Sequence, residues 1–162
     1  MTPINFSPGP SQLYFTVPDH IRQALRENIP SISHRSPTFD AVVKEAYDNL
    51  RELLGIPASH HIFFLGSANE VFERSLQNLV AEKSFHFVNG AFSKRFYEFG
   101  KMLKKNPVKL EVPEGQGFNE PIAIDSDTEL IAVTHNETST GVSFPLDFIH
   151  SLKTQHPNAL IA

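Results

Sequence analysis

Residues 85–103 read FHFVNGAFSKRFYEFGKML, and this stretch decides the fold. Its first four residues, Phe85–Val88, form a short and largely apolar run, which is typical of a buried strand. Apolar residues then recur at helical spacing over Phe92–Leu103. Because a strand that passes directly into a helix begins a crossover connection, the stretch predicts a parallel sheet.

The same alternation of strand and helix continues on both sides of this stretch. Short apolar runs predict strands at His61–Leu65, Val108–Val112, Leu130–Thr134 and Ala159–Ala162. Helical spacing predicts helices that begin near Val17 and that span Thr38–Leu54, Asn69–Val80 and Leu146–Leu152. The sequence therefore predicts an α/β fold, with a largely parallel sheet and helices on both of its faces.

Two segments are expected along the chain. Residues 1–17 contain Pro3, Pro8, Gly9 and Pro10 without helical periodicity, which predicts an ordered arm or loop. Residues 18–162 are predicted to form one α/β domain. Its last five residues, NALIA, have the pattern of an opening strand. We therefore expect an incomplete domain that ends inside a strand, as in a fragment of a longer protein.

The composition excludes several classes of function. The 162 residues include 14 Lys and Arg against 18 Asp and Glu, and the formal net charge of −4 gives no footprint for nucleic acid. With no cysteine, the chain has neither a thiolate metal site nor a cysteine nucleophile. It has neither a signal-peptide pattern nor an apolar run of the roughly 20 residues that a membrane helix needs. We expect a cytoplasmic protein with no membrane partner.

Small residues at Gly66, Ser67 and Ala68 mark a junction between a predicted strand and a predicted helix. Backbone N–H groups of a first helical turn point outward and favour an anion, so this junction could cradle a phosphate group. Serine is also a common N-cap residue without any ligand, and a plain helix cap is the alternative.

A polar run, His135–Gly141, directly follows the predicted strand at Leu130–Thr134. In a parallel sheet this is the edge at which ligands bind. The alternative is a turn in which polar side chains bond the backbone and Gly141 supplies a positive φ. Phe92 follows another strand end and could stack on a planar ring, although its spacing with Phe96 and Phe99 favours a place in the core.

His34 and Arg35 lie in a short predicted loop between two helices. A histidine–arginine pair can bind a phosphate or carboxylate through charged donors, and the alternative is a surface arginine near a helix end. The other histidines lack the spacing of metal ligands, and no pair of carboxylates stands out as an acid–base couple. The sequence predicts no metal site.

In combination, these motifs resemble the N-terminal half of the class V, fold type I aminotransferases, which use pyridoxal 5'-phosphate, and phosphoserine aminotransferases most of all. The resemblance covers all 162 residues. The segments that carry it are Asn5–Ser11, Ser33–Ser36 with Phe39, Gly66–Ala68, Asn89–Phe92 and His135–Gly141.

The resemblance implies a role for each motif. Gly66, Ser67 and Ala68 would hold the cofactor phosphate. Phe92 would stack on the pyridine ring, at a position where phosphoserine aminotransferases usually have tryptophan, and Thr138 would bond the phenolic oxygen.

The resemblance also implies that His34 and Arg35 reach the substrate phosphate, commonly across a homodimer interface. Gly9, in the Pro8–Pro10 segment of the arm, would lie near the substrate carboxylate.

The resemblance further places the Schiff-base lysine, and the aspartate that pairs with the pyridine nitrogen, beyond Ala162. We therefore expect no catalytic lysine in this chain, and no turnover by the chain alone. The implied reaction of the intact protein is transfer of an amino group between phosphoserine and 2-oxoglutarate, in serine biosynthesis. The alternatives are an alanine–glyoxylate or serine–pyruvate type of aminotransferase, and a non-catalytic module that binds a phosphate ligand or a partner.

Overall fold

The computed structural model describes residues 4–7, 9, 11–119 and 122–162. The chain forms two compact units, Met1–Phe64 and Leu65–Ala162. The predicted division into an arm, residues 1–17, and one α/β domain, residues 18–162, stays a prediction. Of the predicted arm, Met1, Thr2, Pro3, Pro8 and Pro10 lie outside the described residues.

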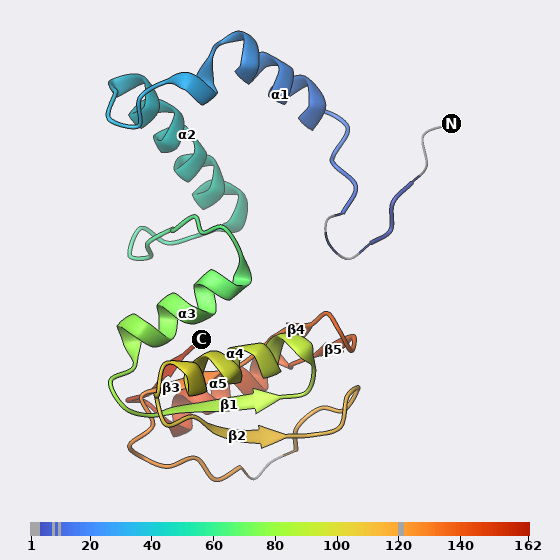
Figure 1. The fold of residues 1–162 in the computed structure, drawn as a ribbon, viewed down its shortest axis with the longest axis vertical. Helices are drawn as coiled ribbons and strands as arrows, with labels where there is room; N and C mark the ends of the chain where they lie inside the picture. Colours follow the sequence, from blue (N-terminus) through green and yellow to red (C-terminus); the bar gives the residue numbers. More distant parts are fainter. Residues whose placement is uncertain (1–3, 8, 10, 120–121) are drawn as a thin grey trace. The chain divides into compact units, whose positions relative to one another are not determined.

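The first unit contains helix α1 (Val17–Arg26), the short 3₁₀ helix η1 (Ile29–Ser31) and helix α2 (Pro37–Leu54), all drawn in blue to teal in Figure 1. The Oγ of Ser36 accepts a hydrogen bond of 3.2 Å from the N–H of Phe39 and so caps the start of α2. Gly55 ends the same helix with a φ of 62°, a left-handed conformation that glycine adopts without a steric penalty. Both predicted helices of this segment are confirmed.

The predicted strand at His61–Leu65 is wrong. In the part of the chain that the structure describes, these residues pair with no strand, and the side chains of Phe63 and Phe64 are 77% and 64% exposed. An apolar run becomes a strand only where a neighbour supplies hydrogen bonds, and other segments make up the sheet. The ring of Phe64 instead stacks on that of Tyr47 in α2, with 5.4 Å between the ring centroids.

The second unit contains the sheet and the remaining helices. Its elements in chain order are α3 (Ala68–Leu79), β1 (Ser84–Val88), α4 (Ala91–Met102), β2 (Val108–Glu111), β3 (Leu130–Ala132), β4 (Asn136–Glu137), β5 (Val142–Ser143), α5 (Leu146–Gln155) and β6 (Leu160–Ile161). The predicted strands and helices of this region are confirmed, except that β2, β3 and β6 are shorter than expected and that the hairpin of β4 and β5 is new.

A four-stranded sheet with the order β2-β1-β3-β6 forms the centre of this unit, and all its pairings are parallel. Phe85 of β1 lies beside Val108 of β2 and beside Ile131 of β3. Every residue of β1 is buried. The largely parallel sheet that the sequence predicts is confirmed.

The two faces of the sheet carry two separate hydrophobic clusters. On one face, Phe85, Phe87 and Ile131 pack with Leu152 of α5. On the other face, Leu130 and Ala132 pack with side chains of α3 and α4, among them Leu76 and Phe96. Because side chains alternate along a strand, neighbouring residues of β3 enter different clusters. Helices therefore cover both faces, as predicted (Figure 1).

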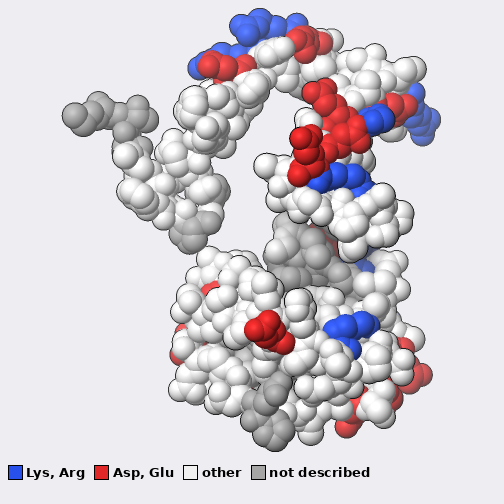
Figure 2. Space-filling view, turned by 180° about the vertical axis from the view of Figure 1, so that it is seen from behind, with Lys and Arg blue, Asp and Glu red and all other residues white. Residues whose placement is uncertain are grey.

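Basic and acidic side chains are interspersed on the face of the molecule that Figure 2 draws. Ion pairs such as Arg22–Asp19, at 2.6 Å, and Arg95–Glu98, at 3.2 Å, lie on the surface. No helix among the described residues is both long enough and apolar enough to span a bilayer.

His86 is the one fully buried histidine among the described residues. Its Nε2 lies 2.9 Å from the Oγ of Ser84, and its Nδ1 has no partner in the described part of the chain. Burial lowers the pKa of His86 to about 4, from an ordinary value of 6.5.

We therefore expect the protein to lose stability as the pH falls from about 6.5 to about 4, because the unfolded chain binds a proton there that the folded chain does not. Above pH 6.5 the neutral His86 contributes its full share to the free energy of unfolding, and about 3 kcal/mol of that free energy is lost across the window. Urea unfolding at a series of pH values measures the free energy of unfolding of the protein and of the non-titrating variant His86→Gln. Equal pH dependence of the two proteins would contradict the prediction.

Candidate functional site

The carboxyl ends of β1 and β3 lead into two segments that meet at one edge of the sheet. After β1, Asn89 and Gly90 lead into α4, and after β3 the chain continues into the β4–β5 hairpin. In Figure 1 the hairpin lies beside the start of α4. Ligands of open parallel sheets bind at this edge. The polar run His135–Gly141 and Phe92 therefore lie where the sequence predicts a site.

The hairpin is an antiparallel pair, with Asn136 opposite Ser143 and Glu137 opposite Val142. Gly141 has a φ of +72°, and its N–H donates a hydrogen bond of 2.9 Å to the carbonyl oxygen of Glu137. Glycine reaches this conformation without the penalty of a Cβ. The turn and the positive φ proposed for Gly141 are confirmed.

The side chain of Glu137 is completely buried at the centre of this arrangement. Its Oε2 accepts hydrogen bonds of 2.9 Å from both the N–H and the Oγ–H of Ser93. Its Oε1 accepts bonds of 2.6 Å from the Oγ–H of Ser139 and of 3.3 Å from each of the N–H groups of Ser139 and Phe92. We call Glu137, Ser93 and Ser139 the carboxylate clamp.

Burial alone would raise the pKa of the Glu137 carboxyl, because it disfavours the charged form. Hydrogen bonds from Ser139 and Ser93 outweigh this effect, and the pKa is below its usual value. The clamp therefore holds an ionised carboxylate at neutral pH. A negative charge at the N-terminus of α4 is also favoured by the helix dipole.

Phe92 and Thr138 are brought together by the clamp, since each is adjacent in sequence to clamp residues. Phe92 is the second residue of α4 and is 43% exposed, whereas Phe96 is buried in the core. Phe92 belongs to neither hydrophobic cluster of the described residues, so the core position that its spacing favours is wrong. Thr138 lies in the hairpin turn with an exposed side chain.

Gly66, Ser67 and Ala68 form the start of α3. The Oγ of Ser67 accepts a hydrogen bond of 3.3 Å from the N–H of Glu70, as the plain helix cap predicts. The carboxylate of Glu70 accepts a bond of 2.9 Å from the N–H of Gly66. The N–H groups of Ala68 and Asn69 have no acceptor in the part of the chain that the structure describes. Two open donors therefore remain at this helix end.

The starts of α3 and α4 differ in this respect. The N–H groups of Ala91, Phe92 and Ser93 are all bonded, to the Oγ of Ser139 or to the carboxylate of Glu137. An external anion therefore has free backbone donors at α3 but not at α4. Helices α3 and α4 pack against each other. The N-termini of both helices belong to the unit Leu65–Ala162.

Gly9, His34 and Arg35 belong to the other unit, Met1–Phe64. Gly9 is exposed in a bend. His34 and Arg35 occupy a tight turn that is closed by a hydrogen bond of 3.0 Å from the N–H of Ser36 to the carbonyl of Ser33. Both side chains of the pair are exposed.

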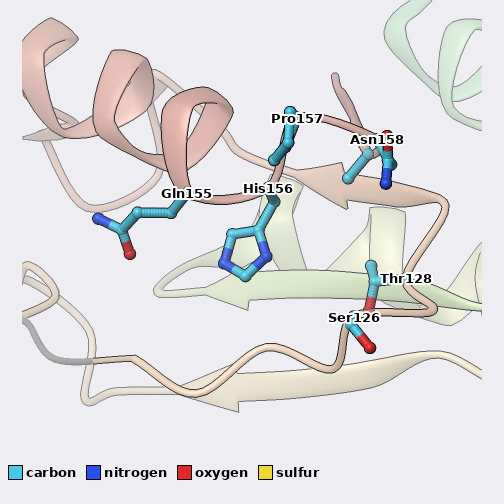
Figure 3. A pocket seen from close by; sticks show the side chains of 7 residues that line it. Ser126, Thr128, Gln155, His156, Pro157 and Asn158 are labelled. Atoms are coloured by element: carbon cyan, nitrogen blue, oxygen red, sulfur yellow. The ribbon is translucent and has the colours of Figure 1, made fainter.

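Among the pockets lined by described residues of the second unit, two lie at opposite ends of the sheet. A cavity of about 410 Å³ lies beside the carboxyl end of β3, and it is lined by Phe72, Phe96, His135 and Asn136 among others. A smaller pocket of about 100 Å³, drawn in Figure 3, is formed by residues 126 and 128 and residues 155–159, which precede β3 and β6. The larger cavity is at the ligand-binding edge. No cluster of three or more potential metal ligands exists among the described residues.

Reasoning from the sequence missed Glu137, Ser93 and Ser139 as functional residues. One signal was present, because Glu137 is an acidic residue that follows a buried strand closely. An acidic residue so near a buried strand needs hydrogen-bond donors, but the sequence does not say which distant N–H groups supply them. Those donors come from residues 44 to 45 positions away.

Gly90 is required by the clamp, and its replacement gives a test. A Cβ at Gly90 would lie 2.4 Å from the Cγ of Glu137 and 2.6 Å from the Oγ of Ser139. We expect Gly90→Ala to lower the free energy of unfolding by about 1–3 kcal/mol, as overpacking does. The matched control is Gly117→Ala, whose Cβ would meet no atom within 4 Å. Denaturant unfolding measures both, and equal stability of the two variants would contradict the prediction.

No family model matches the chain. Among curated proteins it is 30% identical over 173 residues to the phosphoserine aminotransferase of Lactococcus lactis subsp. cremoris, an alignment that covers 98% of this chain and 47% of that protein. The chain therefore spans about half the length of the curated relatives that it matches.

Solved structures agree with this likeness. The phosphoserine aminotransferase of Cytophaga hutchinsonii superposes with a TM-score of 0.94 at 50% identity, over 98% of this chain and 44% of that chain. A phosphoserine aminotransferase of Trichomonas vaginalis, described as bound to PLP, has a TM-score of 0.73 at 23% identity, over 86% of this chain and 46% of that chain, and shows the fold alone. The chain is thus a homologue of the N-terminal half of the phosphoserine aminotransferases, as its motifs predict.

Proposed function

We propose that the chain is part of a class V aminotransferase that uses pyridoxal phosphate to transfer an amino group between phosphoserine and 2-oxoglutarate in serine biosynthesis. The likeness to phosphoserine aminotransferases over 98% of the chain supports this proposal. We further propose a cytoplasmic homodimer, since the motifs resemble those of enzymes whose sites combine two subunits. When bound, pyridoxal phosphate supplies the carbonyl group and the electron-withdrawing ring of the reaction.

The observation that carries the proposal is that the segments of Phe92 and Thr138 are joined by hydrogen bonds at the carboxyl edge of the sheet. The clamp joins the segments of these two residues, and both side chains reach solvent. An exposed ring and an exposed hydroxyl group on two joined segments fit a flat ligand that carries an oxygen at its rim. In the proposed site Phe92 stacks on the pyridine ring, and Thr138 donates to the phenolic oxygen.

The start of α3 fits the cofactor phosphate. The open N–H groups of Ala68 and Asn69 are donors at the positive end of a helix, and an anion is favoured there. Gly66 and Ser67 complete the proposed phosphate loop. Glu70 now bonds Gly66, so its carboxylate would face the incoming phosphate and has to turn away.

His34 and Arg35 are proposed to bind the phosphate of the substrate. Arg35 lies just before the N-terminus of α2, where a positive charge gains nothing from the helix dipole. An exposed arginine at that position is therefore better explained by an anionic ligand than by helix stability. Gly9 is proposed to lie near the substrate carboxylate.

The phosphate loop can be separated from a plain cap by a pair of serine variants. Ser67 and Ser36 cap α3 and α2 in the same way, at 3.3 and 3.2 Å. We expect Ser67→Ala and Ser36→Ala each to lower the free energy of unfolding of the cofactor-free protein by about 1 kcal/mol. Only Ser67→Ala should also weaken the binding of pyridoxal phosphate, by about tenfold, through the loss of a phosphate contact.

Denaturant unfolding and fluorescence titration with pyridoxal phosphate measure the two effects on the natural polypeptide. If Ser67→Ala bound the cofactor as tightly as Ser36→Ala, Ser67 would be a cap alone.

Intact mass spectrometry of the natural polypeptide after borohydride reduction with pyridoxal phosphate tests the function. We expect one covalent adduct on a single lysine beyond Ala162, in a chain well above 18.2 kDa. None of the eight lysines of this chain should carry it. A mass that matches this chain without an adduct would contradict the proposal and favour the non-catalytic module.

Substrate choice is tested separately on the same protein. Glutamate should convert the bound cofactor to its amine form, and phosphoserine should react faster than alanine. The change in the cofactor absorbance spectrum follows both reactions. A faster reaction with alanine would favour the alanine–glyoxylate type instead.

A further inference from the structure

Glu137 cannot touch a ligand, because its side chain is completely buried. Its five hydrogen bonds nevertheless all come from Phe92, Ser93 and Ser139. Phe92 is itself proposed to contact the cofactor ring, and Ser139 is adjacent in sequence to Thr138, the other residue proposed to contact it. The carboxylate therefore has a position from which it can control where Phe92 and Thr138 lie without being part of the site's surface.

The clamp joins two segments that are far apart in the sequence. Ser93 and Phe92 start α4, and Ser139 lies in the turn of the β4–β5 hairpin. A second link reinforces the carboxylate, since the N–H of Ala91 donates a bond of 2.8 Å to the Oγ of Ser139. Side chains that are held by several bonds from both directions have little freedom to shift.

The bonding pattern requires a carboxylate and not merely a side chain of that size. Each oxygen of Glu137 accepts bonds from N–H or O–H groups, and the N–H groups cannot turn into acceptors. A glutamine has one amide nitrogen, which would face either the N–H of Ser93 or the N–H groups of Ser139 and Phe92. One half of the clamp would then open.

We propose that Glu137 is a positioning residue, whose buried carboxylate joins the start of α4 to the β4–β5 turn so that Phe92 and Thr138 face the same cofactor ring. This inference rests on the proposed function, because the cofactor is the ligand of those two residues.

The test compares Glu137→Gln with Glu129→Gln in the natural polypeptide. Glu129 is a matched control at the other end of β3, where its carboxylate accepts bonds of 2.8 and 3.1 Å from the N–H groups of Glu82 and Lys83. Three quantities are measured: the melting temperature of the cofactor-free protein, the Kd for pyridoxal phosphate, and the visible circular dichroism of the bound cofactor.

We expect both variants to melt at lower temperature, and only Glu137→Gln to raise the Kd by about tenfold and to reduce the visible circular dichroism, since displaced contacts hold the ring less firmly. An unchanged Kd and an unchanged circular dichroism in Glu137→Gln would overturn the inference and leave Glu137 a structural residue. Equal effects of the two variants on the Kd would overturn it as well.

If Glu137→Gln fails to fold, Ser139→Ala decides the question, because the Ser139 side chain is exposed and its removal deletes two bonds of the clamp. A raised Kd with weaker circular dichroism supports the inference, and wild-type values overturn it. Failure of the proposed function is read on the unaltered protein, which would then bind no pyridoxal phosphate. Failure of this inference is read on the variants of a protein that does bind it.

Discussion

Complete burial of strand β1 is the constraint on which the second unit depends. All five residues of β1 are buried, with β2 and β3 on its two sides and helices on its two faces. Phe85 and Phe87 anchor one hydrophobic cluster, while His86 on the opposite face lies edge-on to the rings of Phe96 and Tyr97 in α4. Because β1 fixes where α4 begins, it also fixes the position of Phe92 at the edge of the sheet.

Most of the fold could be predicted because local patterns and tertiary packing agree. In residues 85–103, the apolar run and the helical spacing both correspond to what the sheet and the cores require, and β1 and α4 form as expected. At His61–Leu65 the local pattern is equally apolar, yet a strand needs a partner, and periodicity carries no information about the partner. The β4–β5 hairpin was missed for the related reason that its polar residues lack the apolar alternation that marks a strand.

The exposed residues of the candidate site could be predicted from the sequence, and the buried carboxylate that holds them could not. Phe92 and Thr138 follow strand ends, and strand ends are visible in the sequence. The carboxylate that joins them could not be predicted, because three of its five hydrogen bonds come from residues at a helix start more than 40 positions away. The spacing of residues along the sequence indicates which side chains share a face of one helix or strand. The side chain of Glu137 instead joins two different elements, the β4–β5 hairpin and the start of α4.

The span of these hydrogen bonds has a consequence for how the protein folds. Contacts between residues 44 to 48 positions apart close long loops. Closing such a loop costs conformational entropy, which other interactions have to offset first. Pairing of β1 with β3 brings the start of α4 and the hairpin together, so the clamp closes only after that pairing exists. We therefore expect the ligand-binding edge to be completed late in folding, so that a nascent chain presents its aromatic ring and its hydroxyl group to a ligand only after the central strands have paired.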